Sequence, residues 1–253
     1  MNPSGVSPSA PPDEENADPK VNLLFSEQSI RSRFVTKVFI LVTIMFAIVA
    51  MMCAMPYIFP SLKIWVQTNM VFFFVSISTD ISFSGVFLVT SVALTCCSSI
   101  RRSYPMNLIA LAIFTLAAGY LTMAATSAYD VQSVLMALCM TTGSSAAIIV
   151  FAIFVRKDLT TCIGIAYVLS MTMMFFGIVA LVACLGFRVT FLYTVYAALG
   201  ALLSMLYLAI DIQLIMGGRR LELSPEEYIF GAMQIFLDIL NIFLYILRIF
   251  GRK

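Results

Sequence analysis

The sequence predicts an all-α polytopic membrane protein, and its composition is the first indication of this class. Of the 253 residues, 61% are hydrophobic and only 11% are charged, and the mean hydropathy is +1.00. The apolar residues form segments of roughly 20 residues or more, the length that a helix needs to cross a bilayer. The basic residues stand in ones and twos at the ends of these segments. We therefore expect contact with the lipid bilayer and none with nucleic acid.

A polar stretch precedes the first apolar segment. Residues 1–30 contain five prolines and the acidic run Asp13-Glu14-Glu15, a composition that cannot bury a core. We expect a disordered cytosolic tail at 1–30 and a single membrane domain of seven helices at 31–253. The helices are expected at about 36–57, 78–98, 105–126, 131–155, 160–185, 189–216 and 225–250.

Local signals set the ends of the first five helices. The first apolar helix ends near Pro56, and the second is counted back roughly 20 residues from the basic pair Arg101-Arg102. Pro105 opens the third, because a proline at the first helical position sacrifices no hydrogen bond. The fourth and fifth helices are expected to serve mainly in packing.

The sixth and seventh helices have the clearest boundaries. Gly217-Gly218 is expected to end the sixth, because glycine readily adopts the left-handed conformation that closes a helix. Ser224-Pro225-Glu226-Glu227 then combines an N-cap serine, a proline at the first position and a glutamate at the third. This is the capping-box pattern, in which the serine and glutamate side chains bond to free amides of the first turn. The seventh helix is therefore expected to begin at Pro225.

Each of these two helices carries one carboxylate in its apolar part, Asp211 in the sixth and Asp238 in the seventh. A charged side chain near the bilayer centre costs about 3 kcal/mol on insertion scales, so an acid there is by default a candidate functional residue. Small and polar residues share a face with each aspartate at steps of three or four. The two stripes are Tyr193, Tyr196, Gly200, Ser204, Tyr207 and Asp211, and Glu227, Gly231, Gln234, Asp238, Asn241, Tyr245 and Arg248. We infer that the stripes face each other and that the two acids share a proton.

The positions of the two acids along their helices constrain how the helices are aligned. Asp238 lies 13 residues beyond Pro225, about 20 Å along the axis, whereas Asp211 lies five residues before Met216, about 8 Å. The acids can meet only if the first two turns of the seventh helix extend beyond the end of the sixth. We expect those turns to stand in the water or headgroup layer.

The distribution of basic residues predicts the orientation. Most lie in the N-terminal flank and around Arg101-Arg102, Arg156-Lys157 and Arg219-Arg220, which indicates a cytosolic N-terminus. A full seventh span would then place the basic C-terminal end outside the cytosol, against the same rule. Either the seventh helix is re-entrant or incompletely spanning, or packing at the centre of the bundle overrides the rule.

Several sequence blocks resemble those of the transmembrane BAX inhibitor motif family, and most of all its Lifeguard branch. They are Ser-Tyr-Pro-Met-Asn-Leu at 103–108, Ile-Phe-Thr-Leu at 113–116, Asp-Ile-Gln-Leu-Ile-Met-Gly-Gly at 211–218, Leu-Ser-Pro-Glu-Glu-Tyr at 223–228, and Phe-Leu-Asp-Ile-Leu-Asn-Ile-Phe-Leu-Tyr-Ile-Leu at 236–247. The last three, in this order and at this spacing, are specific. The resemblance covers about residues 30–253.

The resemblance implies six helices in two layers around a central C-terminal helix, and a calcium-permeable leak. It implies that Asp211 and Asp238 match the family's paired, pH-sensing aspartates, and that Arg101 or Arg102 is the latch that binds the first of them. It also implies suppression of apoptosis, cell-death regulatory proteins as partners, and residence in the Golgi, the endoplasmic reticulum or the plasma membrane. Two departures bear on the site: Ile210 and Ile212 flank the first aspartate where relatives often have tyrosine and threonine, and the third helix carries no acid.

The residues and the resemblance together lead to one hypothesis. Two carboxylates in an apolar site do not both ionise easily, so they are expected to hold one shared proton. With that proton the sixth and seventh helices are tied and the path is shut; without it, two like charges separate or bind a cation. Calcium prefers such oxygen ligands, so Asp211 and Asp238 are also candidate calcium ligands, with calcium as the permeant or weakly bound ion and no cofactor. The expected polar lining is Ser204, Tyr207, Gln234, Asn241 and Tyr245.

Three other interpretations compete with the leak. The aspartates could serve only to hold the bundle together through hydrogen bonds. The protein could be a non-conducting membrane scaffold that binds cell-death regulators through its termini. An intramembrane aspartyl protease also needs two membrane-embedded aspartates, but neither acid lies in a Gly-x-Gly-Asp or Tyr-Asp setting. We therefore expect a protein that is not an enzyme.

Overall fold

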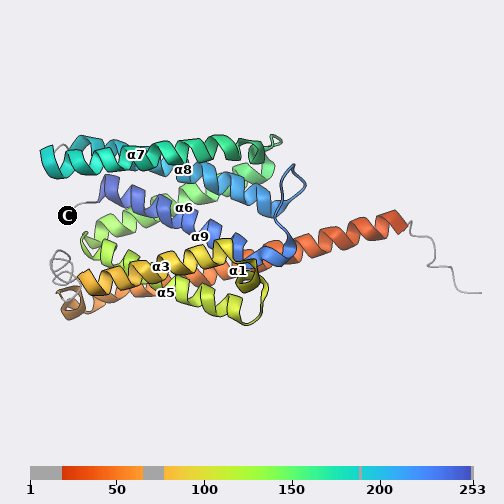
Figure 1. The fold of residues 1–253 in the computed structure, drawn as a ribbon, viewed down its shortest axis with the longest axis horizontal. Coiled ribbons are helices and arrows are strands. Elements are labelled where there is room, and N and C mark those ends of the chain that lie inside the picture. The colour runs from red at the N-terminus through yellow and green to blue at the C-terminus, as the bar shows by residue number, and fades with distance from the viewer. Residues whose placement is uncertain (1–18, 65–76, 188–189, 252–253) are drawn as a thin grey trace, which may run out of the picture.

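The computed structural model describes residues 19–64, 77–187 and 190–251, and their regular secondary structure is helical throughout. The predicted all-α class is thus confirmed (Figure 1). The elements are, in chain order, α1 (Pro19–Ile58), α3 (Ile77–Cys96), α4 (Ser98–Arg102), α5 (Met106–Ser127), α6 (Val131–Phe154), the 3-10 turn η2 (Leu159–Cys162), α7 (Ile163–Phe187), α8 (Thr190–Met216), the 3-10 turn η3 (Pro225–Glu227) and α9 (Tyr228–Phe250).

The long helices have the dimensions of membrane spans. Within the described ranges, six helical segments are long and apolar enough to cross a bilayer: Glu27–Ile58, Met106–Ser127, Val131–Phe154, Leu159–Ala183, Phe191–Met216 and Pro225–Phe250. Helix α3, where the second span was expected, is 20 residues long. The number and length of these apolar helices identify a multi-pass integral membrane protein.

Helix α9 lies between two groups of helices (Figure 1). On one side α1 and α3 pack against α5, and on the other α8 packs against α6 and α7. Helix α9 contacts both groups, through α1, α3 and α5 and through α6 and α8. Half of the α9 span is buried, against 11% of the span that contains α7. The C-terminal helix is therefore central in the bundle, and α7 is peripheral.

Aromatic side chains join α9 to the first group. Phe236 of α9 is fully buried, and its ring centroid lies 4.8 Å from that of Phe46 and 6.0 Å from that of Phe114. Phe114 in turn stacks on Phe87 at 5.2 Å. Helices in lipid associate mainly through close van der Waals packing, because the lipid tails are as apolar as the side chains and burial of apolar surface brings no gain. This aromatic cluster therefore fixes the position of α9 against α1, α3 and α5.

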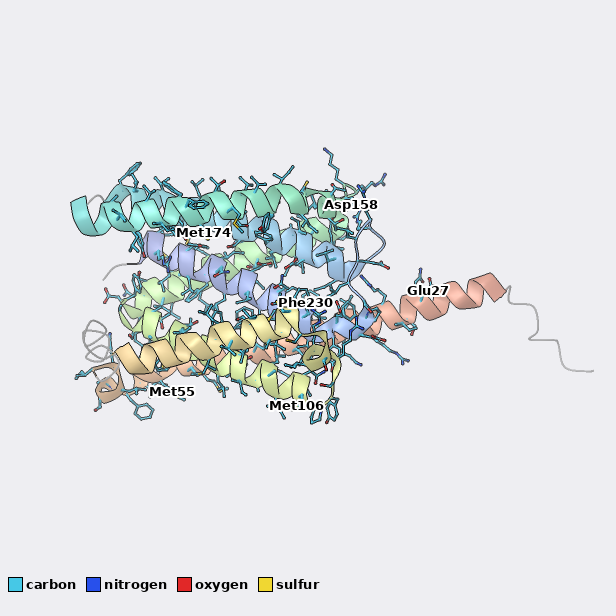
Figure 2. All side chains as sticks on the ribbon, in the orientation of Figure 1. Glu27, Met55, Met106, Asp158, Met174 and Phe230 are labelled. Atoms are coloured by element: carbon cyan, nitrogen blue, oxygen red, sulfur yellow. The ribbon has the colours of Figure 1, made fainter. Side chains whose placement is uncertain are left out.

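Helix α1 begins earlier than the sequence suggested. It starts at Pro19 and runs for 40 residues, so residues 19–30, expected in the disordered tail, are helical. After Pro19 no proline or glycine interrupts the chain before Pro56, and a proline at a helix start does not break it. The first part of α1, which carries Glu27, projects beyond the bundle (Figure 2). The rest of the expected tail, 1–18, lies outside the described residues.

The link between α8 and α9 agrees with the predictions at one end and departs from them at the other. Gly217 and Gly218 have φ values of +71° and +70°, which confirms the left-handed end of α8. The capping box, however, does not form: Ser224 makes no side-chain cap, and a 3-10 turn precedes α9. The Glu227 side chain instead accepts hydrogen bonds from two arginines through Oε1.

Candidate functional site

Asp211 and Asp238 meet at the interface of α8 and α9. Their carboxyl groups lie close enough to each other for a hydrogen bond. A carboxylate can only accept hydrogen bonds, so a bond between two carboxyl groups requires that one of them holds a proton. The Oδ2 atom of each is buried and has no hydrogen-bond partner among the residues that the structure describes. The two side chains thus depend on each other for their polar contacts.

The surroundings of Asp211 are apolar, whereas Asp238 is only partly buried. Asp211 is 6% exposed, and its chain neighbours Ile210 and Ile212 are 1% exposed. In the part of the chain that the structure describes, neither aspartate forms an ion pair; the pairs there involve only Arg101, Arg102 and two glutamates. With no cation bound to either acid, the pair lacks the ion partner that would stabilise two negative charges.

A pocket of about 340 Å³ adjoins Asp238 between α7, α8 and α9. Asp238 lines this pocket and Asp211 does not. Of the predicted polar lining, Ser204, Tyr207, Asn241 and Tyr245 lie on its wall, whereas Gln234 does not. The remaining lining residues are Ser170, Met173, Met174, Tyr196, Gly200 and Leu203.

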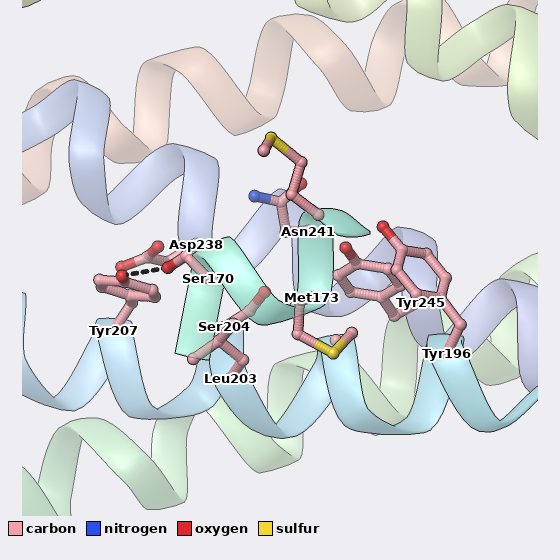
Figure 3. A pocket seen from close by; sticks show the side chains of 11 residues that line it. Ser170, Met173, Tyr196, Leu203, Ser204, Tyr207, Asp238, Asn241 and Tyr245 are labelled. Carbon is pink, nitrogen blue, oxygen red and sulfur yellow. Dashed lines mark hydrogen bonds between the residues drawn. The ribbon is translucent and has the colours of Figure 1, made fainter. Parts of the chain in front are cut away.

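The α7 residues of this wall were not predicted. The hydroxyl groups of Ser170 and Tyr207 are hydrogen-bonded to each other beside Asp238 (Figure 3). Tyr196 and Gly200 lie on the stripe of α8 that also carries Ser204, so their place on the wall could have been predicted. Ser170 belongs to no such stripe, and only the packing of α7 on α8 brings it to the pocket.

Arg101 and Arg102 bind Glu227 at the start of α9. The carboxylate Oε1 of Glu227 accepts hydrogen bonds from Arg101 Nη2 at 2.8 Å and from Arg102 Nη2 at 2.9 Å. Arg102 Nη1 also lies 3.6 Å from Oε2 of Glu226. The Arg101 guanidinium lies over the ring of Phe230. We call Arg101, Arg102, Glu226 and Glu227 the arginine–glutamate cluster.

The expected contact of an arginine latch with Asp211 is therefore not made in this structure. Asp238, the partner of Asp211, lies 11 residues beyond Glu227, about 16 Å along α9. An arginine side chain held at Glu227 does not bridge that distance. Gly231, one turn into α9, lies against Ile215 near the end of α8, so the beginning of α9 extends beyond α8. There Glu227 meets Arg101 and Arg102, which end α4.

Other charged residues at this end of the bundle tie the loops together. Arg31 of α1 donates to the carbonyl oxygens of Leu214 and Leu223, both at 2.7 Å. The Arg31 guanidinium also lies so close to Gly217 that a Cβ there would stand 2.5 Å from Nη2. In the sequence, Arg31 is one of several basic residues in the N-terminal flank. Its hydrogen bonds to backbone carbonyl oxygens could not be predicted, because every residue carries such an oxygen.

Gln213 and Asp158 join the end of α8 to the link between α6 and η2. Gln213 is 1% exposed; it accepts from the Leu159 amide at 2.7 Å and donates to the carbonyl oxygen of Lys157 at 3.1 Å. Asp158 accepts from the hydroxyl group of Thr160 at 2.6 Å and from the amide of Arg220 at 3.0 Å. These hydrogen bonds hold the pKa of the Asp158 carboxyl below its usual value, and the bond from the Thr160 side chain has the largest effect.

A cation lies at the opposite end of α9. The Arg248 guanidinium stands 5.6 Å from the ring centroid of Tyr245 and 5.8 Å from that of Tyr193. Tyr245 and Tyr196 pack edge to face, with centroids 6.0 Å apart. Four residues of the predicted stripes thus lie together at this end, and two of them, Tyr196 and Tyr245, line the pocket.

The arrangement of carboxylates bears on metal binding. Among the described residues no group of three or more histidine, cysteine, aspartate or glutamate side chains could hold a metal ion. Calcium takes six to eight oxygen ligands in typical sites. Asp211 and Asp238 alone supply too few for tight binding.

The chain was compared with known proteins. The profile of the family described as "Inhibitor of apoptosis-promoting Bax1" matches residues 31–253. Protein lifeguard 3 of Mus musculus is 35% identical over 230 residues, which cover 90% of this chain and 72% of that protein. Protein lifeguard 3 of Homo sapiens is 33% identical over 229 residues, 90% of this chain and 71% of the human protein. Protein lifeguard 4 of Mus musculus is 34% identical over 154 residues, 58% of this chain and 59% of its own length. The extent of these matches confirms the resemblance seen in the sequence: the chain belongs to the BAX inhibitor family, among its lifeguard proteins.

Proposed function

We propose that the protein is a pH-sensitive leak channel for calcium, gated by the protonation of Asp211 and Asp238. The observation that supports this most is the close approach of two carboxyl groups, within hydrogen-bonding reach, at the interface of α8 and α9. A hydrogen bond between them exists only while the pair holds a proton. The protein is thereby sensitive to pH at the contact between its central helix and α8.

In the protonated state the pair holds α8 and α9 together. When the proton leaves, two negative charges face each other in an apolar setting. Two like charges about 4 Å apart repel by about 4 kcal/mol at an effective dielectric constant of 20. No ion pair within the described ranges compensates either acid. The repulsion therefore drives the helices apart at this level and connects the pocket beside Asp238 to the cytosolic end.

The separated carboxylates then become oxygen ligands for a passing cation. Together with the hydroxyl groups of Ser204 and Tyr207 they offer calcium a weak site, which suits conduction because the ion must also leave. The arginine–glutamate cluster holds the first turn of α9, so the movement is concentrated beyond Glu227.

The cellular role we propose is calcium homeostasis linked to suppression of cell death. The family's description as an inhibitor of an apoptosis-promoting protein supports the second part. The basic residues at the end of the bundle that holds Arg101 and Arg219 support a cytosolic N-terminus. Endomembranes such as the Golgi or endoplasmic reticulum, or the plasma membrane, are the proposed location. The aspartate pair acts as a gate and performs no catalysis.

The experiment is calcium flux through the purified protein in liposomes loaded with a calcium-sensitive dye. Flux through the unaltered protein should rise as the pH is raised. Asp211→Asn and Asp238→Asn each keep a hydrogen bond across the interface but remove the like-charge repulsion, so flux should stay low at every pH. Asp130→Asn, at the exposed start of α6, is the matched control and should behave like the unaltered protein.

Two results would contradict the proposal. If both aspartate variants kept the pH dependence of the unaltered protein, the pair would not be the gate. If the unaltered protein carried no calcium at any pH, the scaffold interpretation would replace the leak. Peptide cleavage by the same preparation would instead support the protease.

A further inference from the structure

The pocket between α7, α8 and α9 has two chemically different ends. Asp238, Ser170 and Tyr207 lie together at one end, and Tyr196 and Tyr245 at the other (Figure 3). Tyr196 and Tyr207 are 11 residues apart on α8, so the pocket extends for about 16 Å along the bundle. Its long wall carries Met173. One end is acidic and polar, and the rest is aromatic and apolar.

The acidic end has acceptor capacity that the protein does not use. A carboxylate has about four lone-pair sites, and the one hydrogen bond of Asp238 found among the described residues is that with Asp211. Its Oδ2 atom is buried without a donor. A ligand that donates hydrogen bonds would satisfy this group, whereas a ligand that only accepts them would not.

The negative charge at the Asp238 end of the pocket favours a positively charged ligand. A pair of carboxyl groups that shares one proton carries one negative charge, and no residue on the wall is basic. The Arg248 guanidinium lies over the ring of Tyr245 at the far border. It is ten residues from Asp238, about 15 Å along α9, and leaves the charge of the acidic end uncompensated.

The walls favour an organic cation over a metal ion. Rings of three tyrosines and the side chains of two methionines line the pocket. Aromatic faces attract ammonium groups and pack against apolar groups. A divalent metal ion would need more oxygen ligands than one carboxylate and a few hydroxyl groups supply. Met174, which also lines the pocket, is 52% exposed, so the α7 wall of the pocket reaches the surface of the bundle.

We propose that this pocket binds a small primary amine, with its ammonium group at Asp238 and its apolar part between Met173 and the rings of Tyr196 and Tyr245. The volume of about 340 Å³ lies at the lower end of the range of roughly 300–1,000 Å³ typical of small-molecule pockets. It suits a ligand of about ten non-hydrogen atoms. The inference uses the geometry of the pocket and does not depend on ion conduction.

The test is isothermal titration calorimetry of the full chain in detergent with 2-phenylethylamine. The neutral analogue 2-phenylethanol has the same shape with a hydroxyl group in place of the ammonium. The amine should bind saturably at one site per chain, and the alcohol at least tenfold more weakly. Asp238→Asn should weaken amine binding at least tenfold and leave the affinity for the alcohol nearly unchanged.

A second variant keeps the test decisive if Asp238→Asn fails to fold. Met173→Trp fills the pocket and leaves both aspartates in place, so it should abolish binding of the amine. Met171→Trp, on the same helix but not on the pocket wall, is the matched control and should bind the amine like the unaltered protein. Equal affinities for amine and alcohol, no saturable binding, or undiminished binding by Met173→Trp would each overturn the proposal. Because the readout is binding, a failed leak proposal would leave this result standing.

Discussion

Glu227→Gln tests whether the arginine–glutamate cluster holds the start of the central helix. The carboxylate joins α9 to two arginines that follow α3, and the side chains of Glu227 and Arg101 are 14% and 13% exposed. Hydrogen bonds that involve charged groups contribute about 1.5–3 kcal/mol. The Arg102 side chain is 49% exposed, and pairs with exposed groups contribute about 0–1 kcal/mol. We therefore expect Glu227→Gln to lower the free energy of unfolding by about 2–3 kcal/mol, mostly through Arg101.

A double-mutant cycle separates the two arginines. Unfolding is followed by circular dichroism in mixed micelles as the denaturing detergent is increased, for Glu227→Gln combined with Arg101→Met or with Arg102→Met. The coupling free energy with Arg101 should exceed about 1.5 kcal/mol, and that with Arg102 should stay below about 1 kcal/mol. A larger coupling for Arg102, or a loss below about 0.5 kcal/mol for Glu227→Gln, would refute the reasoning.

Two further predictions concern the same end of the molecule. Gly217 and Gly218 have nearly equal positive φ values, but only at Gly217 would a Cβ meet the Arg31 guanidinium. Gly218→Ala should lose about 1–2 kcal/mol from backbone strain alone, and Gly217→Ala should lose more in the same unfolding assay; equal losses would show that Arg31 does not pack there. The lowered pKa of Asp158 means that its folded form binds a proton less readily than its unfolded form, so its contribution is present at neutral pH and is lost as the pH falls through about 4 and below. Asp158→Asn should therefore reduce the loss of stability between neutral and acid pH in the same unfolding assay, and an unchanged loss would contradict this reasoning.

Much of the membrane architecture followed from the sequence because lipid restricts what a chain can do. A spanning segment must be helical and apolar, so the spans and the two acids within them stood out. The left-handed conformation of Gly217 and Gly218 after α8 could also be predicted, because glycine is the residue type that adopts positive φ values without strain. The alignment of α8 with α9 followed from helix geometry once the two acids were placed together.

What failed or was missed depends on contacts between distant segments. The sequence of Ser224 to Glu227 fits the capping-box pattern, but in the structure Glu227 pairs with Arg101 and Arg102, which are far from it in the sequence. Ser170 on the pocket wall could not be predicted, because a single serine in an apolar helix shows no direction until its neighbours are known.

Interactions with the main chain were hidden for a related reason. Arg31 and Gln213 bind backbone carbonyl and amide groups. Every residue except proline supplies both groups, so no pattern of side chains identifies the partner. The first turns of α1 were assigned to a tail because the composition of the whole segment 1–30 was averaged, although its second part contains no helix breaker after Pro19.

Infrared difference spectroscopy across a pH titration measures whether Asp211 and Asp238 share a proton. We expect the band of a protonated carboxyl group while the leak is shut, and loss of that band over the same pH range in which calcium flux rises. Asp211→Asn and Asp238→Asn should each alter the band, which would assign it to the pair. If both carboxyl groups were ionised throughout the range in which the flux changes, protonation of the pair could not be the gate.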